Sequence, residues 1–208
     1  DYVIFGGGSI WPNHTLLSDP ILSGKIRYSI IGVSVRELTS SHVSSIIINN
    51  ADLVVVRDHH SAKLLNNPKV QCMPDLTWFK PLPLKDSISG ANKSVSVNLR
   101  NWSRLDWNSK EIVSRIKSRN YDSIYGVSFF EGSPSLEDGS AMSDKKKMAA
   151  AGVTDFVDGS YYATLNTSIN IGMRFHYLVL SAQMGVPFVG FDYHPKIKAF
   201  MQDIGFEE

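Results

Sequence analysis

The sequence predicts an α/β protein with two lobes, each built around a parallel sheet. Two observations and one general rule lead to this prediction. Short apolar segments rich in β-branched residues alternate along the chain with segments of helical periodicity. Strands and helices that alternate in this way form parallel sheets with helices on both faces. The periodicity breaks over residues 81–94, where prolines and small polar residues gather, and this break predicts a linker.

The first lobe, residues 1–80, has four predicted strands. They are Tyr2–Phe5, Arg27–Val35, Ala51–Arg57 and Val70–Met73. A helix is predicted over 38–50 with Ser40 or Ser41 as its N-cap, and a short helix over 58–65 begins at Asp58. The chain opens directly on a strand, and few helices are predicted to cover the strands. We therefore expect a partial domain with an incomplete sheet.

The second lobe, residues 95–208, repeats the alternation. Its predicted strands are Ser94–Leu99, Ser123–Phe129, Ile169–Gly172 and Val186–Phe191. Its predicted helices are Ser109–Arg119, Asp144–Ala151, Tyr161–Leu165, Phe175–Met184 and Pro195–Ile204. The strongly apolar helix that begins at Phe175 is the most distinctive of them.

Composition narrows the function classes. The chain has 208 residues, of which 43% are hydrophobic, enough for a sizeable core. A net charge of +1 argues against nucleic acid as the main partner. The longest apolar runs, such as Ser29–Val35, are too short to span a bilayer, so we expect no transmembrane segment. One cysteine, Cys72, excludes an intrachain disulfide and favours a reducing, cytoplasmic location.

Arg174 and His176 are the strongest candidates for chemistry. They follow a predicted strand and open a predicted helix, and ligands of parallel sheets bind at such junctions. Helix N-termini favour anions, and a guanidinium matches a carboxylate or phosphate. The alternative is a surface arginine and a histidine satisfied within the core.

Arg100 also follows a predicted strand. If that strand and the one before Arg174 lie in one parallel sheet, both arginines open on the same edge and suit a small polyanion. Alone, Arg100 is an ordinary solvated loop residue.

Three residues of the first lobe are weaker candidates. Gly7 and Gly8 follow the first strand, where glycines let the backbone approach a ligand, but they match no nucleotide-binding signature and also suit a tight turn. Arg57 ends the third strand and could instead pair with a carboxylate across the sheet edge.

We expect no metal site, because the adjacent His59 and His60 do not share a helix face.

Five segments together resemble the polysaccharide pyruvyl transferase family. The strongest is INIGMRFHYLVLSAQMGVPFVGFDYHPKIKAF at 169–200, similar to a strand, an M-R-L-H motif, a small-residue helix, a G-V-P strand and a Y-x-P-K helix, with Phe175 in place of the usual Leu. The others are FGGGSIW at 5–11, VVVRDHHSAKLL at 54–65, MPDLTW at 73–78 and SVNLRNW at 96–102.

The resemblance implies a fold like that of GT-B glycosyltransferases, with two Rossmann-like domains. Family members transfer the enolpyruvyl group of phosphoenolpyruvate to a saccharide, forming a pyruvate ketal and using no cofactor. It implies that Arg174 and Arg100 bind this donor in the C-terminal domain and that His176 is catalytic. Gly7, Gly8 and Arg57 would then lie on the side of the acceptor, a saccharide or lipid-linked saccharide. The family usually carries a further N-terminal βα segment, so we expect the N-terminal domain to be truncated.

Two other functions stay open at this point. A GT-B sugar-nucleotide glycosyltransferase would share the fold and would also bind an anion in its C-terminal domain. A non-catalytic domain for partner assembly in glycan biosynthesis is the other alternative.

Overall fold

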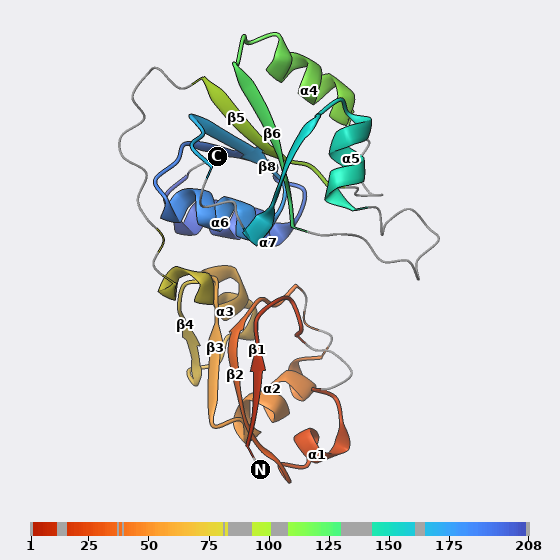
Figure 1. Cartoon of the computed structure of the whole chain (residues 1–208). Helices are drawn as coiled ribbons and strands as arrows, with labels where there is room; N and C mark the ends of the chain where they lie inside the picture. The colour runs from red at the N-terminus through yellow and green to blue at the C-terminus, as the bar shows by residue number, and fades with distance from the viewer. Residues whose placement is uncertain are drawn as a thin grey trace. The chain divides into compact units, whose positions relative to one another are not determined.

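The chain divides into two compact units. The computed structural model describes residues 2–11, 16–36, 38, 40–80, 82, 93–100, 108–129, 143–160 and 165–206. The first unit comprises Asp1–Lys80 with His194–Glu208, and the second comprises Pro81–Tyr193. Figure 1 shows one sheet in each unit. All strand pairs in both sheets are parallel, so the predicted α/β class with two parallel sheets is confirmed.

The sheet of the first unit follows the order of the chain. Its strands are β1 (Tyr2–Gly6), β2 (Arg27–Val33), β3 (Leu53–Val56) and β4 (Val70–Cys72), in the order β1-β2-β3-β4. Phe5, Ile30, Val54 and Val70 stand opposite one another across the sheet and belong to one apolar core. This core is what holds the first unit together.

Short helices connect these strands. They are α1 (Asp19–Leu22), α2 (Ser41–Asn50), α3 (His59–Leu65) and the 3₁₀ helix η1 (Leu76–Phe79). Ser40 is the N-cap of α2 and Asp58 is the N-cap of α3, each accepting a backbone N–H with its side chain. Both N-caps were among those predicted from the sequence. The short helix α1 was not predicted.

Helix α7 (Pro195–Asp203) belongs to the first unit. The sequence placed residues 95–208 in one C-terminal domain, so the structure corrects the assignment of the last residues. The physical reason lies in contacts with α3. The Asp203 carboxylate accepts the His59 backbone N–H at 3.3 Å and lies 2.9 Å from His59 Nδ1. Ile197 and Phe200 on the apolar face of α7 are buried.

In the parallel sheet of the second unit, the order in which strands are added reverses at the central strand. Its strands are β5 (Ser94–Asn98), β6 (Ser123–Ser128), β7 (Asp155–Asp158), β8 (Ile169–Gly172) and β9 (Phe188–Gly190). Their order is β7-β6-β5-β8-β9. The chain first builds outward from β5 to β7 and then returns to the other side of β5. The boundary between β5 and β8 is therefore the switch point where ligands of such sheets bind.

In the part of the chain that the structure describes, three helices cover this sheet. They are α4 (Ser109–Lys117), α5 (Asp144–Ala150) and α6 (Phe175–Gln183). Figure 1 shows α4 and α5 on one face and α6 on the other. Val95 and Val97 of β5 share a buried apolar cluster with Val113 of α4 and Met148 of α5, so both helices are packed against the sheet through an apolar core.

Some predictions differ from the structure or lie outside it. Strand β7 was not predicted, because its sequence, DFVD, has only two apolar residues. The proposed linker 81–94 and the helix Tyr161–Leu165 fall largely outside the described residues. In the described part of the chain, no helix is both long and apolar enough to cross a membrane.

Candidate anion-binding site

The order of the second sheet brings two predicted arginines to one edge. Strands β5 and β8 are neighbours, and their last residues, Asn98 and Gly172, stand opposite each other. Arg100 and Arg174 each follow two residues later. The condition set by the sequence, that both strands share one parallel sheet, is therefore met. Both arginines lie beside the switch point.

Arg174 is held by contacts at its backbone and its side chain. Its N–H donates to Asn98 Oδ1 at 3.0 Å. Its guanidinium donates through Nε and Nη2 to the two carboxylate oxygens of Asp144, with the shortest contact 2.7 Å. The side chain of Arg174 is 21% exposed, whereas that of Asp144 is fully buried. The arginine thus reaches solvent from an anchored position.

Asp144 was not predicted as a site residue. It is the first residue of α5, and Ser143 before it caps the helix through a bond from the Lys146 N–H. An acidic residue there is typical of a helix start. The structure adds two donors to its carboxylate, the Phe129 N–H at 3.1 Å and Asn98 Nδ2 at 3.3 Å. No pattern in the sequence signals these distant partners.

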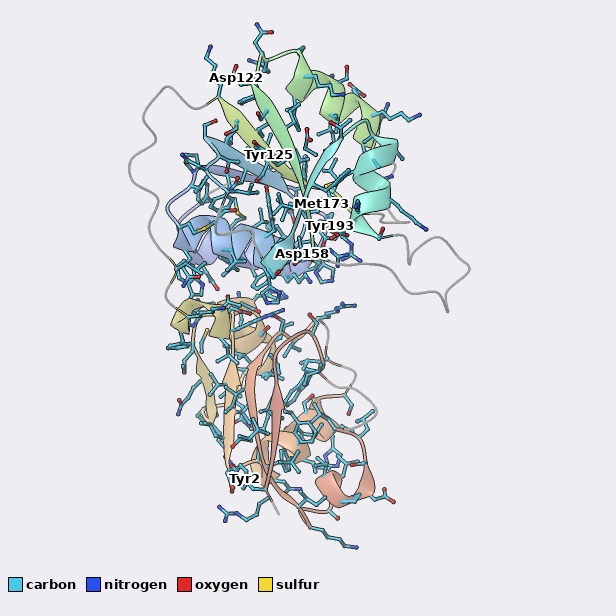
Figure 2. All side chains as sticks on the ribbon, viewed as in Figure 1. Tyr2, Asp122, Tyr125, Asp158, Met173 and Tyr193 are labelled. Atoms are coloured by element: carbon cyan, nitrogen blue, oxygen red, sulfur yellow. The ribbon has the colours of Figure 1, made fainter. Side chains whose placement is uncertain are left out.

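Arg100 is oriented by Tyr193. Its Nη1 donates to the Tyr193 hydroxyl at 3.3 Å, and its guanidinium carbon lies 5.8 Å from the centre of the Tyr193 ring. Figure 2 shows Met173 and Tyr193 close together at the edge of the second sheet, and the Arg100 N–H lies 3.5 Å from Met173 Sδ. Contact with an aromatic face restrains a guanidinium without neutralising it.

His176 is exposed at the second position of α6. Arg174 is the N-cap of this helix and has no capping bond from its side chain. The His176 ring lies 5.4 Å from the ring of Phe175, at 76°. Phe175 itself is buried, so it fixes the helix while the imidazole beside it faces outward. The predicted histidine is thus at a helix N-terminus and open to solvent.

A buried polar network fixes the face of α6 that meets the sheet. The Ser96 hydroxyl lies 2.6 Å from both Asn170 Oδ1 and the Tyr177 hydroxyl. Asn170 Nδ2 donates to the Ser181 hydroxyl at 3.2 Å. These four side chains are fully buried. Since each bond has a directed geometry, the network sets how α6 lies on β5 and β8.

The glycine loop of the first unit adopts a left-handed backbone. Gly7 has φ +70° and Gly8 has φ +71°, which residues with a side chain rarely adopt. A Cβ on Gly7 would meet nothing within 4 Å, and one on Gly8 would meet Ile10 only at 3.8 Å. The conformation of the turn, rather than a lack of space, requires these glycines. Their predicted contact with a substrate stays a prediction.

Arg57 takes the structural role that the sequence had left open. Its Nη1 lies 2.8 Å from Asp75 Oδ2, and its Nε donates to the Ser34 hydroxyl at 2.6 Å. Its side chain is only 2% exposed. Asp75 follows β4, so the predicted pairing across the sheet edge is confirmed. This burial argues against direct contact between Arg57 and a substrate.

A small hollow opens near the carboxyl ends of β1, β2 and β3. It encloses about 220 Å³, including space open to solvent, and its lining includes Ser9, Arg36, Asp58, His60, His194 and Lys196. His194 Nδ1 accepts the Lys196 N–H at 3.2 Å as the N-cap of α7. A neutral His194 ring therefore carries its proton on Nε2.

The sulfur of Cys72 is poorly suited to nucleophilic chemistry. Burial raises the pKa of its thiol, and the carboxylates of Asp203 and Asp58 raise it further. The thiol is therefore protonated near neutral pH. Among the described residues, no group of three or more His, Cys, Asp or Glu side chains could hold a metal ion.

A model of one protein family matches residues 1–195, almost the whole chain, and its description is polysaccharide pyruvyl transferase. The chain belongs to this family. This assignment agrees with the resemblance that the five sequence segments indicated.

The other comparisons add little to the family assignment. Comparison with curated proteins gives no significant match. Among solved structures, the chain is similar to one in the crystal structure of accessory secretory protein 1,2 and 3 in Streptococcus pneumoniae, with a TM-score of 0.48 and 13% identity. The match covers 91% of this pyruvyl transferase family chain but only 40% of that chain.

Proposed function

We propose that this chain transfers the enolpyruvyl group of phosphoenolpyruvate to two hydroxyls of a saccharide, forming a pyruvate ketal. One observation carries the proposal. Arg100 and Arg174 follow adjacent strands at the switch point of the second sheet. Phosphoenolpyruvate has a carboxylate and a phosphate a few ångströms apart, and two guanidinium groups on one edge suit both anions.

The proposed reaction sets clear demands on the site. Two C–O bonds form between sugar oxygens and C2 of the donor, and the bond from C2 to the phosphate oxygen breaks. The two hydroxyls lose two protons. One proton is added to C3, which becomes a methyl group, and the other leaves with inorganic phosphate. The site must therefore move protons and stabilise a leaving phosphate.

His176 is our proposed acid–base group. It is exposed at the N-terminus of α6, two residues after Arg174. An imidazole exchanges protons near neutral pH, and Arg174 would stabilise the leaving phosphate. This assignment gives the three residues distinct roles, with two arginines binding the donor and one histidine moving a proton.

We propose the first unit as the acceptor side. The glycine loop at Gly7 and Gly8 follows β1 at the carboxyl edge of its sheet, where a backbone without side chains can approach the hydroxyls of a saccharide or lipid-linked saccharide. The proposed donor and the presence of a single cysteine, Cys72, both suit a cytoplasmic location.

Calorimetric titration of the full chain tests the proposal. We expect heat from phosphoenolpyruvate and none from UDP- or GDP-sugars. Binding of a nucleotide sugar instead would favour a glycosyltransferase, and binding of neither would favour a non-catalytic domain. Incubation with phosphoenolpyruvate and a saccharide library, followed by mass spectrometry, should then reveal a product that carries a pyruvate ketal.

A further inference from the structure

We infer that Asp144 is the positioning residue of the anion site: its carboxylate fixes the Arg174 guanidinium in the orientation that receives the donor. The inference rests on the proposed function and names a residue that neither the sequence nor the family match assigned. Asp144 oxygens accept from Arg174 Nη2 at 2.7 Å and from Nε at 3.0 and 3.2 Å. Two parallel bonds of this kind fix the plane of the guanidinium as well as its distance.

The carboxylate of Asp144 is itself rigidly held. It accepts the Phe129 N–H at the end of β6 and Asn98 Nδ2 at the end of β5. Asn98 also accepts the Arg174 N–H with its Oδ1 and donates to the Val127 carbonyl at 2.8 Å. The arginine is therefore fixed at its backbone and at its guanidinium by one network. Anchoring of this kind preorganises a site before its ligand arrives.

The burial of Asp144 needs an explanation beyond stability. A buried ion pair is often no more stabilising than apolar residues of the same shape, because both charges lose their hydration. Here only the carboxylate is fully buried, whereas the arginine stays 21% exposed. A pair that buries its anion and presents its cation to solvent is suited to holding that cation for a ligand.

Because Asp144 is negatively charged, the direction in which its neutralisation changes anion affinity tests the inference. A carboxylate beside Arg174 repels an incoming anion. If Asp144 were only a nearby charge, its neutralisation would tighten anion binding. If Asp144 positions the arginine, its neutralisation weakens binding of the anion. In Asp144→Asn an amide nitrogen replaces one carboxylate oxygen. In place of Oδ2, this nitrogen would face three other donors, Arg174 Nε, the Phe129 N–H and Asn98 Nδ2.

Asp144→Asn in the full chain is the primary test, with Asp122→Asn as its matched control. Asp122 is exposed just before β6, and Figure 2 shows it at the end of the second sheet away from Met173 and Tyr193. We expect phosphoenolpyruvate to bind Asp144→Asn about 10- to 100-fold more weakly, by analogy with the range seen when a residue that orients a metal ligand is lost. Asp122→Asn should match the unmutated chain. Unchanged or tighter binding by Asp144→Asn would overturn the inference.

A double-mutant cycle separates positioning from general structural damage. In an Arg174→Ala background, Asp144→Asn should cause little further loss of phosphoenolpyruvate affinity, because the group that it positions is gone. A loss as large as in the unmutated background would show a role independent of Arg174 and overturn the inference.

A third measurement needs no donor. In ¹⁵N NMR spectra, the Arg174 Nε–H should give a slowly exchanging signal that Arg174→Lys removes and Asp144→Asn shifts or broadens. If the chain fails to bind phosphoenolpyruvate, the proposed function fails, and this signal still tests Asp144. A signal that Asp144→Asn leaves unchanged would overturn the inference by itself.

Discussion

Gly172 and Tyr177 are in close contact where β8 meets α6. A Cβ built on Gly172 would lie 2.3 Å from the Tyr177 ring, far inside ordinary van der Waals distance. The Tyr177 hydroxyl is tied to Ser96 of β5, so the ring cannot easily move away. Because Arg174 and His176 lie between these two residues in the chain, this contact fixes the backbone that carries both.

Gly172→Ala should therefore destabilise the second unit and weaken the site together. We expect a loss of about 1–3 kcal/mol in the free energy of unfolding, as for other overpacked cores. The measurement is urea unfolding of the full chain, beside titration with phosphoenolpyruvate.

Gly6→Ala is the matched control for this substitution. Like Gly172, Gly6 ends a strand and its φ is not positive, but its added Cβ would meet Ile31 O only at 3.9 Å. This variant should unfold and bind the donor almost as the unmutated chain does. Equal stability of the two variants would show that the Gly172 contact relaxes without cost.

Arg174→Lys should weaken donor binding even though it keeps the positive charge. Lysine has a single ammonium and cannot make the two parallel bonds to Asp144. For Arg174→Ala we expect a loss of about 2–5 kcal/mol in binding free energy, typical for one partner of a hydrogen-bonded charge pair. Calorimetric titration with phosphoenolpyruvate measures both variants.

Arg115→Ala is the control for the loss of an arginine in the same unit. Arg115 is exposed on α4 and pairs with Glu111 one turn away. Its removal should leave donor binding unchanged. An Arg174→Ala variant with the affinity of Arg115→Ala would exclude Arg174 from the donor site.

The raised pKa of the buried Tyr28 hydroxyl predicts that the free energy of unfolding falls at high pH. Burial raises the pKa of its hydroxyl from 10.0 to about 12, and the hydroxyl donates to the Ile47 carbonyl at 2.6 Å. Above pH 10 the unfolded chain loses this proton while the folded chain keeps it. The contribution of Tyr28 is therefore complete below pH 10 and is lost as the pH rises towards 12, at about 1.4 kcal/mol per pH unit.

Tyr28→Phe should remove this part of the alkaline slope. The variant loses the bond to Ile47, so its stability at neutral pH should fall by about 1 kcal/mol. Between pH 10 and 12, however, its stability should decline less steeply than that of the unmutated chain. Urea unfolding at several pH values measures both slopes, and parallel slopes would show that Tyr28 does not cause the decline.

The sequence predicted that Arg100 and Arg174 lie at one sheet edge because the rule behind this prediction is local. Arg100 and Arg174 each follow a strand that is recognisable by its own apolar residues. Parallel strands present their carboxyl ends at one edge, so only their adjacency in the sheet was needed. The structure supplied that adjacency through the pairing of Asn98 with Gly172.

Residues with distant partners could not be found in this way. Asp144 lies 30 positions from Arg174 and looks like an ordinary acidic residue at a helix start. Likewise, α7 follows the second unit in the chain, but its Asp203 binds His59, 144 positions away. Local periodicity can indicate that a segment such as α7 is helical, but it says nothing of where the helix packs.

His176 should act in proton transfer rather than in donor binding. It is exposed at the second position of α6, where an imidazole can exchange a proton with a substrate. His176→Gln keeps hydrogen-bonding capacity but cannot carry a proton at neutral pH. In an active full-length protein, we expect kcat to fall by about 10²–10⁴, the usual contribution of a general acid or base, with little change in the Kd for phosphoenolpyruvate.

His42→Gln is a closely matched control for this last prediction. His42 is also an exposed histidine at the second position of a helix, α2 in the first unit. It shares the residue type, the exposure and the helix position of His176, but it does not follow an arginine at the switch point. If both variants keep a normal kcat, His176 is not the acid–base group. If His176→Gln instead loses donor affinity while the chemical step is unchanged, the histidine binds the donor and another group moves the proton.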